Sequence, residues 1–360
     1  MRSIRGLATV AVAIVVAGFA PATPAAASTA PQWHKIFSAA GYTVFGTATA
    51  VSPDGNTVFV TGAANGGGDT GFGETIAYNA ATGARRWLAR YNGRANGNDQ
   101  ARSIAISPDG KSLYVTGRSY GAASRYDYAT VAYDAATGAQ RWASRYNGRA
   151  NGNDFASGVV VAPGGRRVYV TGGSQNSTTR TANPSSHNDF ATVAYTAATG
   201  AQRWVARYND KYNGADEAGS VAITPDGRTV IVAGPSFGNR TGYATAAYNA
   251  ATGAALWTRR ALGFPVAEPL NTRMLAVSPD SRTVYVAGPS PCGFCDYHYR
   301  TVAFAAATGT QLWMSTYNGP GKGDDNPTAV ALSPDGRTLY VTGSTTGAAT
   351  WGFTTIAYRT

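Results

Sequence analysis

Short apolar runs, separated by proline, glycine and asparagine, recur along the whole chain. The clearest unit has four such runs, which predict β-strands at Ser103–Ser107, Ser112–Thr116, Tyr128–Tyr133 and Gln140–Arg145. Short Pro-Asp-Gly and Ala-Thr-Gly turns join the first strand to the second and the third to the fourth, whereas a long loop joins the second to the third. Apolar residues occupy both sides of these strands, as expected for an antiparallel sheet buried on both faces.

This unit is repeated along the chain. The SPDG-like turn begins at Ser52, Ser107, Ala162, Thr224, Ser278 and Ser333. A tryptophan recurs in step with it, at Trp33, Trp87, Trp142, Trp204, Trp257 and Trp313. A period of roughly 55 residues suits a four-stranded propeller blade. The sequence therefore predicts one all-β domain at residues 28–360, a six-bladed β-propeller of four-stranded antiparallel blades.

The two ends of the chain are out of phase with the repeat. The segment around Trp33 matches only a fourth strand, and the C-terminal residues Tyr358–Thr360 end a third strand. We expect the N-terminal strand to pair with the C-terminal one, which would complete the last blade, close the ring and remove two exposed sheet edges.

The first 27 residues differ from the repeats. Arg2 and Arg5 precede an apolar run from Leu7 to Ala20, and a small-residue stretch with Ala25 and Ala27 follows. This order is typical of a secretory signal peptide, and the apolar run is shorter than the roughly 20 residues of a membrane-spanning helix. We expect a secreted, extracellular protein that has no membrane association after cleavage.

The composition is basic, with a formal net charge of +11 at pH 7, and only 14% of the residues are charged. Nucleic acid is not an expected partner of an exported protein. Outside the cell, a basic surface attracts anionic wall polymers or acidic glycans, although the many arginines are also explained by a biased genome composition. We expect a monomer.

Two segments resemble known propeller repeats. Ala132–Trp142, AYDAATGAQRW, resembles the tryptophan-docking motif of the pyrroloquinoline quinone (PQQ) enzyme repeat, and Ser333–Gly343, SPDGRTLYVTG, is similar to the YVTN repeat. The resemblance implies a propeller fold. The aspartate of the docking motif is present only as Asp134, and the resembling quinoprotein dehydrogenases have eight larger blades, calcium, catalytic acids and a disulfide between adjacent cysteines. The sequence departs from that pattern, so a PQQ cofactor is not expected.

Four aspartates precede the first strand of their repeats, at Asp99, Asp154, Asp216 and Asp325. Carboxylates that converge on the propeller axis could bind calcium, which prefers several oxygen ligands. The alternative is that each carboxylate stabilises its own Asn-Gly-rich turn, and repetition with the blade favours this interpretation. No other metal or cofactor is predicted.

The chain has two cysteines, Cys292 and Cys295, in a long loop. In an exported protein this spacing favours a disulfide. A zinc site with His298 would lack an evident fourth ligand, and haem attachment would need a histidine where Asp296 stands.

The long loops carry the candidate ligand-binding residues, because variable loops on a rigid scaffold usually form binding sites. Trp351 is the tryptophan outside the repeat register, so blade packing does not explain it. The candidates are Trp351, Tyr120, Tyr126, Phe237, His187 and His298. We predict a non-catalytic protein that binds a glycan, a wall polymer or another protein with these loops. The alternative is an extracellular enzyme, either a metal-dependent hydrolase or lactonase or a PQQ-dependent dehydrogenase; the absence of a histidine cluster in the sequence favours binding.

Overall fold

A computed structural model of the 360-residue chain describes residues 32–66, 71–121, 124–176, 187–237, 241–262, 274–291, 297–321, 323–346 and 351–360, without the side chains at 241, 261, 262, 291 and 351. These residues form 23 β-strands and no α-helix. Within those ranges the structure therefore has no apolar helix long enough to cross a membrane. The predicted signal peptide, residues 1–27, lies outside the described residues.

The strands form six antiparallel sheets, each a simple up-and-down meander. The first three sheets contain β1 (Thr43–Val51), β2 (Thr57–Asn65), β3 (Gly71–Asn79) and β4 (Arg85–Tyr91); β5 (Asp99–Ile106), β6 (Ser112–Tyr120), β7 (Tyr126–Asp134) and β8 (Gln140–Tyr146); and β9 (Asp154–Val161), β10 (Arg167–Gln175), β11 (Asn188–Thr196) and β12 (Gln202–Tyr208). The others contain β13 (Ser220–Ile223), β14 (Thr229–Phe237), β15 (Thr241–Asn249) and β16 (Ala255–Leu262); β17 (Leu275–Val277), β18 (Thr283–Pro291), β19 (Tyr297–Ala305) and β20 (Gln311–Tyr317); and β21 (Asn326–Leu332), β22 (Thr338–Thr346) and β23 (Trp351–Arg359).

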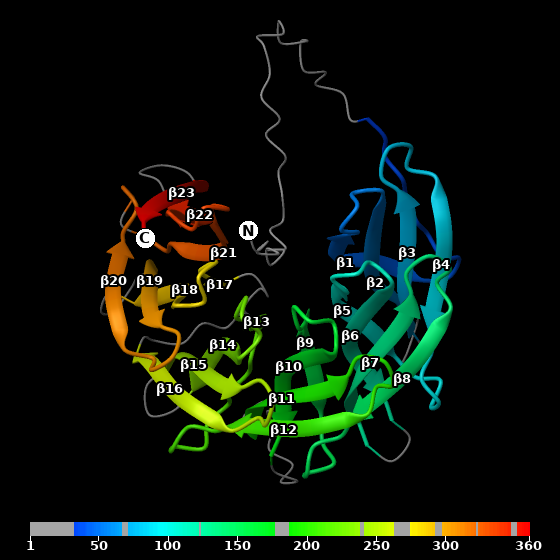
Figure 1. Ribbon diagram of the computed structural model, residues 1–360, viewed down its shortest axis with the longest axis horizontal. Coiled ribbons are helices and arrows are strands. Elements are labelled where there is room, and N and C mark those ends of the chain that lie inside the picture. Colours follow the sequence, from blue (N-terminus) through cyan, green and yellow to red (C-terminus); the bar gives the residue numbers. More distant parts are fainter. Residues whose placement is uncertain are drawn as a thin grey trace, which may run out of the picture.

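Figure 1 shows the six sheets arranged side by side around a common centre, with the first strand of each sheet innermost. Contacts run from β1 to β5, β5 to β9, β9 to β13, β13 to β17 and β17 to β21. This arrangement confirms the prediction of an all-β propeller built of four-stranded antiparallel blades.

The short turns repeat the same chemistry in each sheet. In the turn between β5 and β6, the Ser107 hydroxyl donates to Asp109 Oδ1 at 2.5 Å, and the Lys111 N–H donates to the same oxygen at 3.0 Å. Gly110 has a φ of 70°, in the left-handed region that favours glycine. The sequence signal for these hairpins therefore has a direct physical cause.

The tryptophans of the first four sheets each join their own sheet to the next one, and Trp33, which precedes β1, contacts the first sheet. Trp142 in β8 donates its Nε1–H to the carbonyl oxygen of Ala197 in the third sheet at 2.9 Å. Its ring lies over Gly200, where a Cβ would come within 2.5 Å of the indole, so a larger residue would push the two sheets apart. The corresponding bonds elsewhere are Trp33 to Ala80, Trp87 to Ala135, Trp204 to Ala250 and Trp257 to Ala306.

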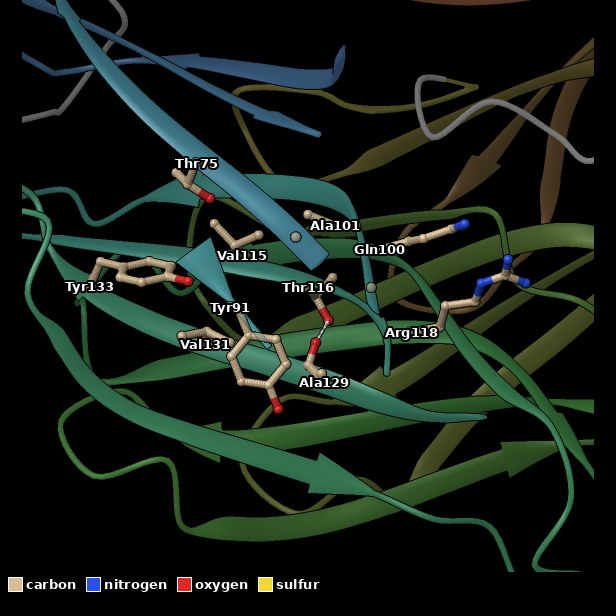
Figure 2. Close-up of a pocket in the computed structure, with 12 residues that line it drawn as sticks. Thr75, Tyr91, Gln100, Ala101, Val115, Thr116, Arg118, Ala129, Val131 and Tyr133 are labelled. Atoms are coloured by element: carbon tan, nitrogen blue, oxygen red, sulfur yellow. Dashed lines mark hydrogen bonds between the residues drawn. The ribbon is translucent and has the colours of Figure 1, made fainter. Parts of the chain in front are cut away.

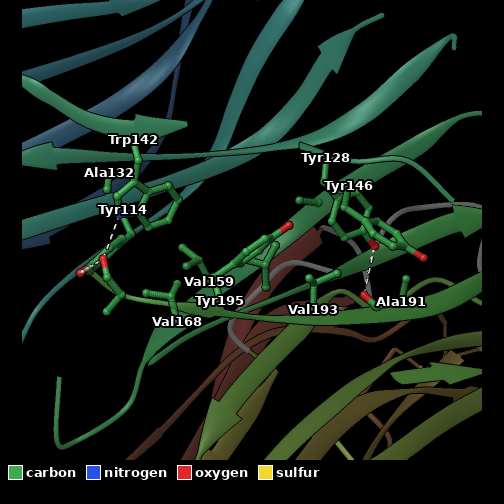
Figure 3. Close-up of a cluster of buried hydrophobic side chains, with 13 residues drawn as sticks. Tyr114, Tyr128, Ala132, Trp142, Tyr146, Val159, Val168, Ala191, Val193 and Tyr195 are labelled. Atoms are coloured by element: carbon green, nitrogen blue, oxygen red, sulfur yellow. Dashed lines mark hydrogen bonds between the residues drawn. The ribbon is translucent and has the colours of Figure 1, made fainter. Parts of the chain in front are cut away.

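The core lies between successive sheets. Figure 3 shows the interface of the second and third sheets, where Tyr114 and Trp142 lie at one end, Tyr128 and Tyr146 at the other, and Tyr195 between them. The buried Tyr128 hydroxyl donates to the Ala191 carbonyl at 3.1 Å, so this polar group retains a partner inside the interface. Aromatic packing thus links the blades, with the Tyr128 hydroxyl hydrogen-bonded across the interface and the Tyr195 hydroxyl buried without a partner among the described residues.

The expected closure of the ring by strand pairing is absent from the described residues. The last sheet has three strands, and β23 has a neighbour only in β22. The Trp33 segment lies instead on the first sheet, where the indole bonds to Ala80 and lies 6.1 Å from the ring of Tyr78. Figure 1 shows the reason: the first and last sheets stand at opposite ends of an arc, so a segment docked on one does not reach the free edge of the other.

Candidate functional site

All long loops lie at one edge of the sheets, because each sheet is a meander whose short turns occupy the opposite edge. We call this edge the long-loop face. It comprises the described loop residues that follow the second and fourth strand of each sheet, together with the strand ends that flank them. Tyr120, Tyr126, His187, Phe237 and His298 lie in these loops or at the strand ends beside them.

The four repeated aspartates are buried anchors for the loops that precede them. Each accepts a hydrogen bond from a backbone N–H six residues earlier. The pairs are Gly93 with Asp99 at 2.6 Å, Gly148 with Asp154 at 2.7 Å, Asp210 with Asp216 at 2.8 Å and Gly319 with Asp325 at 2.6 Å. At 1% exposure or less, these carboxylates stabilise turns, which is the alternative that the sequence left open.

Arginines at the ends of the fourth strands extend this arrangement. Arg145 contacts Asp127 Oδ2 through Nε at 3.1 Å and Nη2 at 2.8 Å, and its Nη1 donates to the Ser119 hydroxyl. In the third sheet, Arg207 bonds to Asp189 and Ser174 in the same way. These charges hold the strand ends together, because a buried carboxylate needs a counter-charge.

In the part of the chain that the structure describes, no three histidine, cysteine, aspartate or glutamate side chains gather closely enough to hold a metal ion. The aspartates of the predicted calcium ring stand one to a sheet, each with its own backbone donor. Calcium binding by this ring stays a prediction.

Asp154 provides a test of the anchoring role. Burial raises its pKa to about 6 from an ordinary value of 3.8, and the Gly148 N–H and the Ser174 hydroxyl offset this only in part. The folded protein therefore binds more protons than the unfolded chain between about pH 4 and pH 6. The stability that Asp154 contributes is fully present below pH 3.8 and is lost as the pH rises through 6.

We expect the Asp154→Asn variant to lack this pH dependence. Relative to the variant, the wild type should lose about 3 kcal/mol of unfolding free energy between pH 4 and pH 7, which corresponds to a shift of about two pKa units. Urea unfolding of both proteins across this pH range measures the difference. If the unfolding free energies of the two proteins changed in parallel with pH, the pKa of Asp154 would not be raised by burial.

Two of the predicted binding residues form a pair on the long-loop face. Tyr120 ends β6 and Tyr126 begins β7, and their rings meet edge to face with centroids 5.5 Å apart. The guanidinium carbon of Arg118 lies 4.5 Å from the centroid of the Tyr126 ring. All three side chains are half-buried, so each is supported by the fold and still reaches solvent.

Arg102 was not among the binding residues predicted from the sequence. This residue occupies a β-bulge in the innermost strand β5, between Ala101 and Ser103, where the register with β6 shifts. Burial and then the nearby charge of Arg118 lower its pKa, and Glu217 from the fourth sheet raises it. The bulge positions in β1, β9 and β21 carry Thr47, Ser157 and Thr328. A charged residue at this inner position was the available signal.

The other predicted binding residues belong to other sheets. Phe237 ends β14 and is half-buried, His187 precedes β11 and is half-buried, and His298 is buried in β19 opposite Ser290. The structure thus brings together Tyr120 and Tyr126, and it places these three residues in the third, fourth and fifth sheets. The side chain of Trp351 and the cysteines Cys292 and Cys295 lie outside the description, so the disulfide stays a prediction.

A small cavity lies between the first and second sheets, lined by residues that include Thr75, Tyr91, Val115 and Tyr133. It has room for about one water molecule, too little for an organic ligand. Figure 2 shows Gln100 and Arg118 at one end, pointing away from its apolar residues. These two are register partners in β5 and β6.

The chain resembles known proteins in sequence and in fold. A PQQ-like family model described as outer membrane protein assembly factor BamB matches residues 15–183, 127–324 and 240–357. No curated protein shows a significant sequence match. A hydrazine synthase structure from Kuenenia stuttgartiensis is 18% identical, with a TM-score of 0.54 over 81% of this chain and 72% of that one. At this identity the likeness shows the fold alone.

Two further solved structures are more distant. The periplasmic gluconolactonase PpgL from Pseudomonas aeruginosa is 16% identical with a TM-score of 0.49, over 86% of this chain and 84% of that one. BamB from Moraxella catarrhalis is 17% identical with a TM-score of 0.36, over 78% and 90%.

Proposed function

Since the chain belongs to the PQQ-like repeat family described as outer membrane protein assembly factor BamB, we propose that it is an exported, non-catalytic propeller that binds carbohydrate on its long-loop face. The predicted signal peptide supports export, and glycans or wall polymers are the extended ligands available outside the cell. The repeated blades supply a rigid scaffold, and the loops supply the binding residues.

The observation that carries this proposal is the Tyr120–Tyr126 pair. Its rings are fixed edge to face at 5.5 Å, and Arg118 supports Tyr126 from one side. Tyrosine combines an apolar face with a polar tip and loses little conformational freedom on binding. The C–H face of a sugar can pack on such a ring while its hydroxyls bond to neighbouring polar groups.

The carboxylates of this face support binding over catalysis. Asp99, Asp127, Asp154 and Asp189 are buried, and backbone or arginine donors hold them in place. A general acid or base must reach the proton that it transfers. These side chains instead stabilise the conformation of the loops. They contribute to ligand binding by preorganising the loops before the ligand arrives.

Affinity electrophoresis through gels that contain dextran, xylan or polygalacturonate tests the proposal. We expect at least one of these polymers to retain the mature protein, and we expect Tyr126→Ala to weaken that retention about tenfold, equivalent to about 1.4 kcal/mol. Tyr340→Ala is the matched control, because Tyr340 is also accessible, at 44% exposure, but lies in the last sheet. Equal retention of wild type and Tyr126→Ala would contradict the proposal, as would no retention by any polymer.

A further inference from the structure

The two edges of the propeller differ in how they display charge. In the described part of the chain, every exposed carboxylate lies in a short turn, at Asp54, Asp109, Asp226, Asp280 or Asp335. The exposed charged residues of the long-loop face are basic, at Arg94, Arg125, Arg149 and Lys211. The carboxylates of this face are buried or half-buried. A ligand that approaches the described loops around Arg94 and Arg149 therefore meets positive charge.

Two of these arginines are presented by identical, rigid loops. The sequence YNGRANGND occurs at 91–99 and again at 146–154, and it carries Arg94 in one copy and Arg149 in the other. In both copies an Asn side chain bonds across the loop, Asn92 to Asn96 at 3.0 Å and Asn147 to Asn151 at 2.6 Å. The buried aspartate at the end of each copy fixes the loop to the next sheet. Successive blades thus present the two arginines from ordered loop backbones, so the loops themselves lose little freedom on binding.

The half-buried pair Arg102 and Arg118 adds positive charge on the inner side of this surface. Burial and then the charge of Arg118 lower the pKa of Arg102, and the carboxylate of Glu217 raises it. One oxygen of Glu217 already accepts a bond from Asn188 at 2.7 Å. Arg118 Nε is buried and has no hydrogen-bond partner among the described residues. Two positive charges that one carboxylate neutralises only in part lower the stability of the fold. Such an arrangement is typical of a binding site, so we treat this position as a candidate.

We propose that the long-loop face of the second and third blades binds an acidic carbohydrate polymer, with Arg94, Arg102, Arg118 and Arg149 pairing with its carboxylate or phosphate groups. This inference rests on the proposed carbohydrate-binding function and specifies the ligand class. The Tyr120–Tyr126 pair packs against the sugar rings. The planar guanidinium groups bind planar carboxylates in two-point fashion, and they also suit phosphate.

Salt-dependent retention tests the charge of the ligand. The probes are polygalacturonate for carboxylate, a glycerol phosphate polymer for phosphate, neutral dextran, and a single-stranded oligonucleotide as the non-carbohydrate polyanion, all at one ionic strength. We expect the wild type to be retained at least tenfold more strongly by one of the acidic polymers than by dextran, with retention that falls as salt rises. The acidic polymer that binds more tightly identifies the anionic group.

The variant is Arg94→Gln combined with Arg149→Gln, which changes exposed residues and spares the core. We expect it to lose at least tenfold in retention on the preferred acidic polymer. Arg282→Gln combined with Arg337→Gln is the matched control, because it also removes two exposed arginines, both from short turns, and should bind as the wild type does. Circular dichroism and urea unfolding verify that both variants are folded.

The outcomes separate this inference from the proposed function. Retention on dextran equal to that on both acidic polymers would overturn the acidic-ligand inference and leave carbohydrate binding in place. Tighter binding of the oligonucleotide would also overturn it, as would full retention of the double variant. Absence of retention by any carbohydrate would instead remove the proposed function itself.

Discussion

Replacing Trp142 with alanine is expected to lower the free energy of unfolding by about 3–5 kcal/mol, the range for truncating a large buried aromatic residue. The indole lies between Tyr114 and Tyr195, with centroid distances of 5.8 and 6.3 Å, and bonds to the Ala197 carbonyl. The substitution removes both aromatic contacts and leaves a cavity between the second and third sheets. Urea unfolding of wild type and variant measures the loss.

Trp33→Ala is the matched comparison. Trp33 makes the same kind of bond to Ala80 and packs on Tyr78. Tyr340, which is equivalent in β22 to Tyr114 in β6, stands 44% exposed in the last sheet. Because Trp33 has one aromatic partner instead of two, Trp33→Ala should lower the free energy of unfolding by about half as much as the Trp142 substitution. Equal losses would contradict the arc and indicate that Trp33 also packs on Tyr340 in solution.

Replacing Arg145 with methionine should have an effect of similar size, about 3–5 kcal/mol, because it leaves the buried Asp127 without its counter-charge. Arg145 donates twice to Asp127 Oδ2 and also holds Ser119. Methionine preserves much of the side-chain volume, so the measured loss reports mainly on the charge. Thermal and urea unfolding at pH 7 measure it.

Arg337→Met is the control for this experiment. The Arg337 side chain is 86% exposed and lies 4.0 Å from an Asp335 that is 58% exposed. An ion pair in water contributes little, so we expect a change below about 0.5 kcal/mol. Adding Asp127→Asn to Arg145→Met should recover part of the stability. A loss of less than 1 kcal/mol for Arg145→Met alone would show that Asp127 is accommodated without the arginine.

The blade pattern could be predicted because its causes are local. The SPDG turn, the glycine after it and the repeated tryptophan each act within one or two neighbouring sheets. The strands themselves are longer than predicted. Asp99–Ile106 and Ser112–Tyr120 extend the strands expected at Ser103–Ser107 and Ser112–Thr116. An aspartate such as Asp99 is typical of a loop in the sequence. In the structure it begins strand β5, because its buried carboxylate accepts a hydrogen bond from the Gly93 N–H.

The arginine contacts were harder to predict, because their partners are distant in sequence. Arg145 is 18 residues from Asp127 and 26 from Ser119. A usable signal existed, since an arginine follows the repeat tryptophan by three positions at Arg90, Arg145, Arg207 and Arg260. The position of Arg102 depends on a bulge, and the open end depends on how far the last sheet stands from the first. Neither is encoded in a local pattern.

The arc has a consequence for how the molecule fluctuates. In a closed ring every blade has two neighbours, whereas here the first and last sheets each have one, and Phe353 of β23 is left 84% exposed. Stacked repeats of this kind behave as a one-dimensional array, which frays from its ends. Backbone amides should therefore exchange with solvent slowest in β9–β16 and progressively faster towards β1 and β23, so the ends can open and close while the middle of the molecule remains folded.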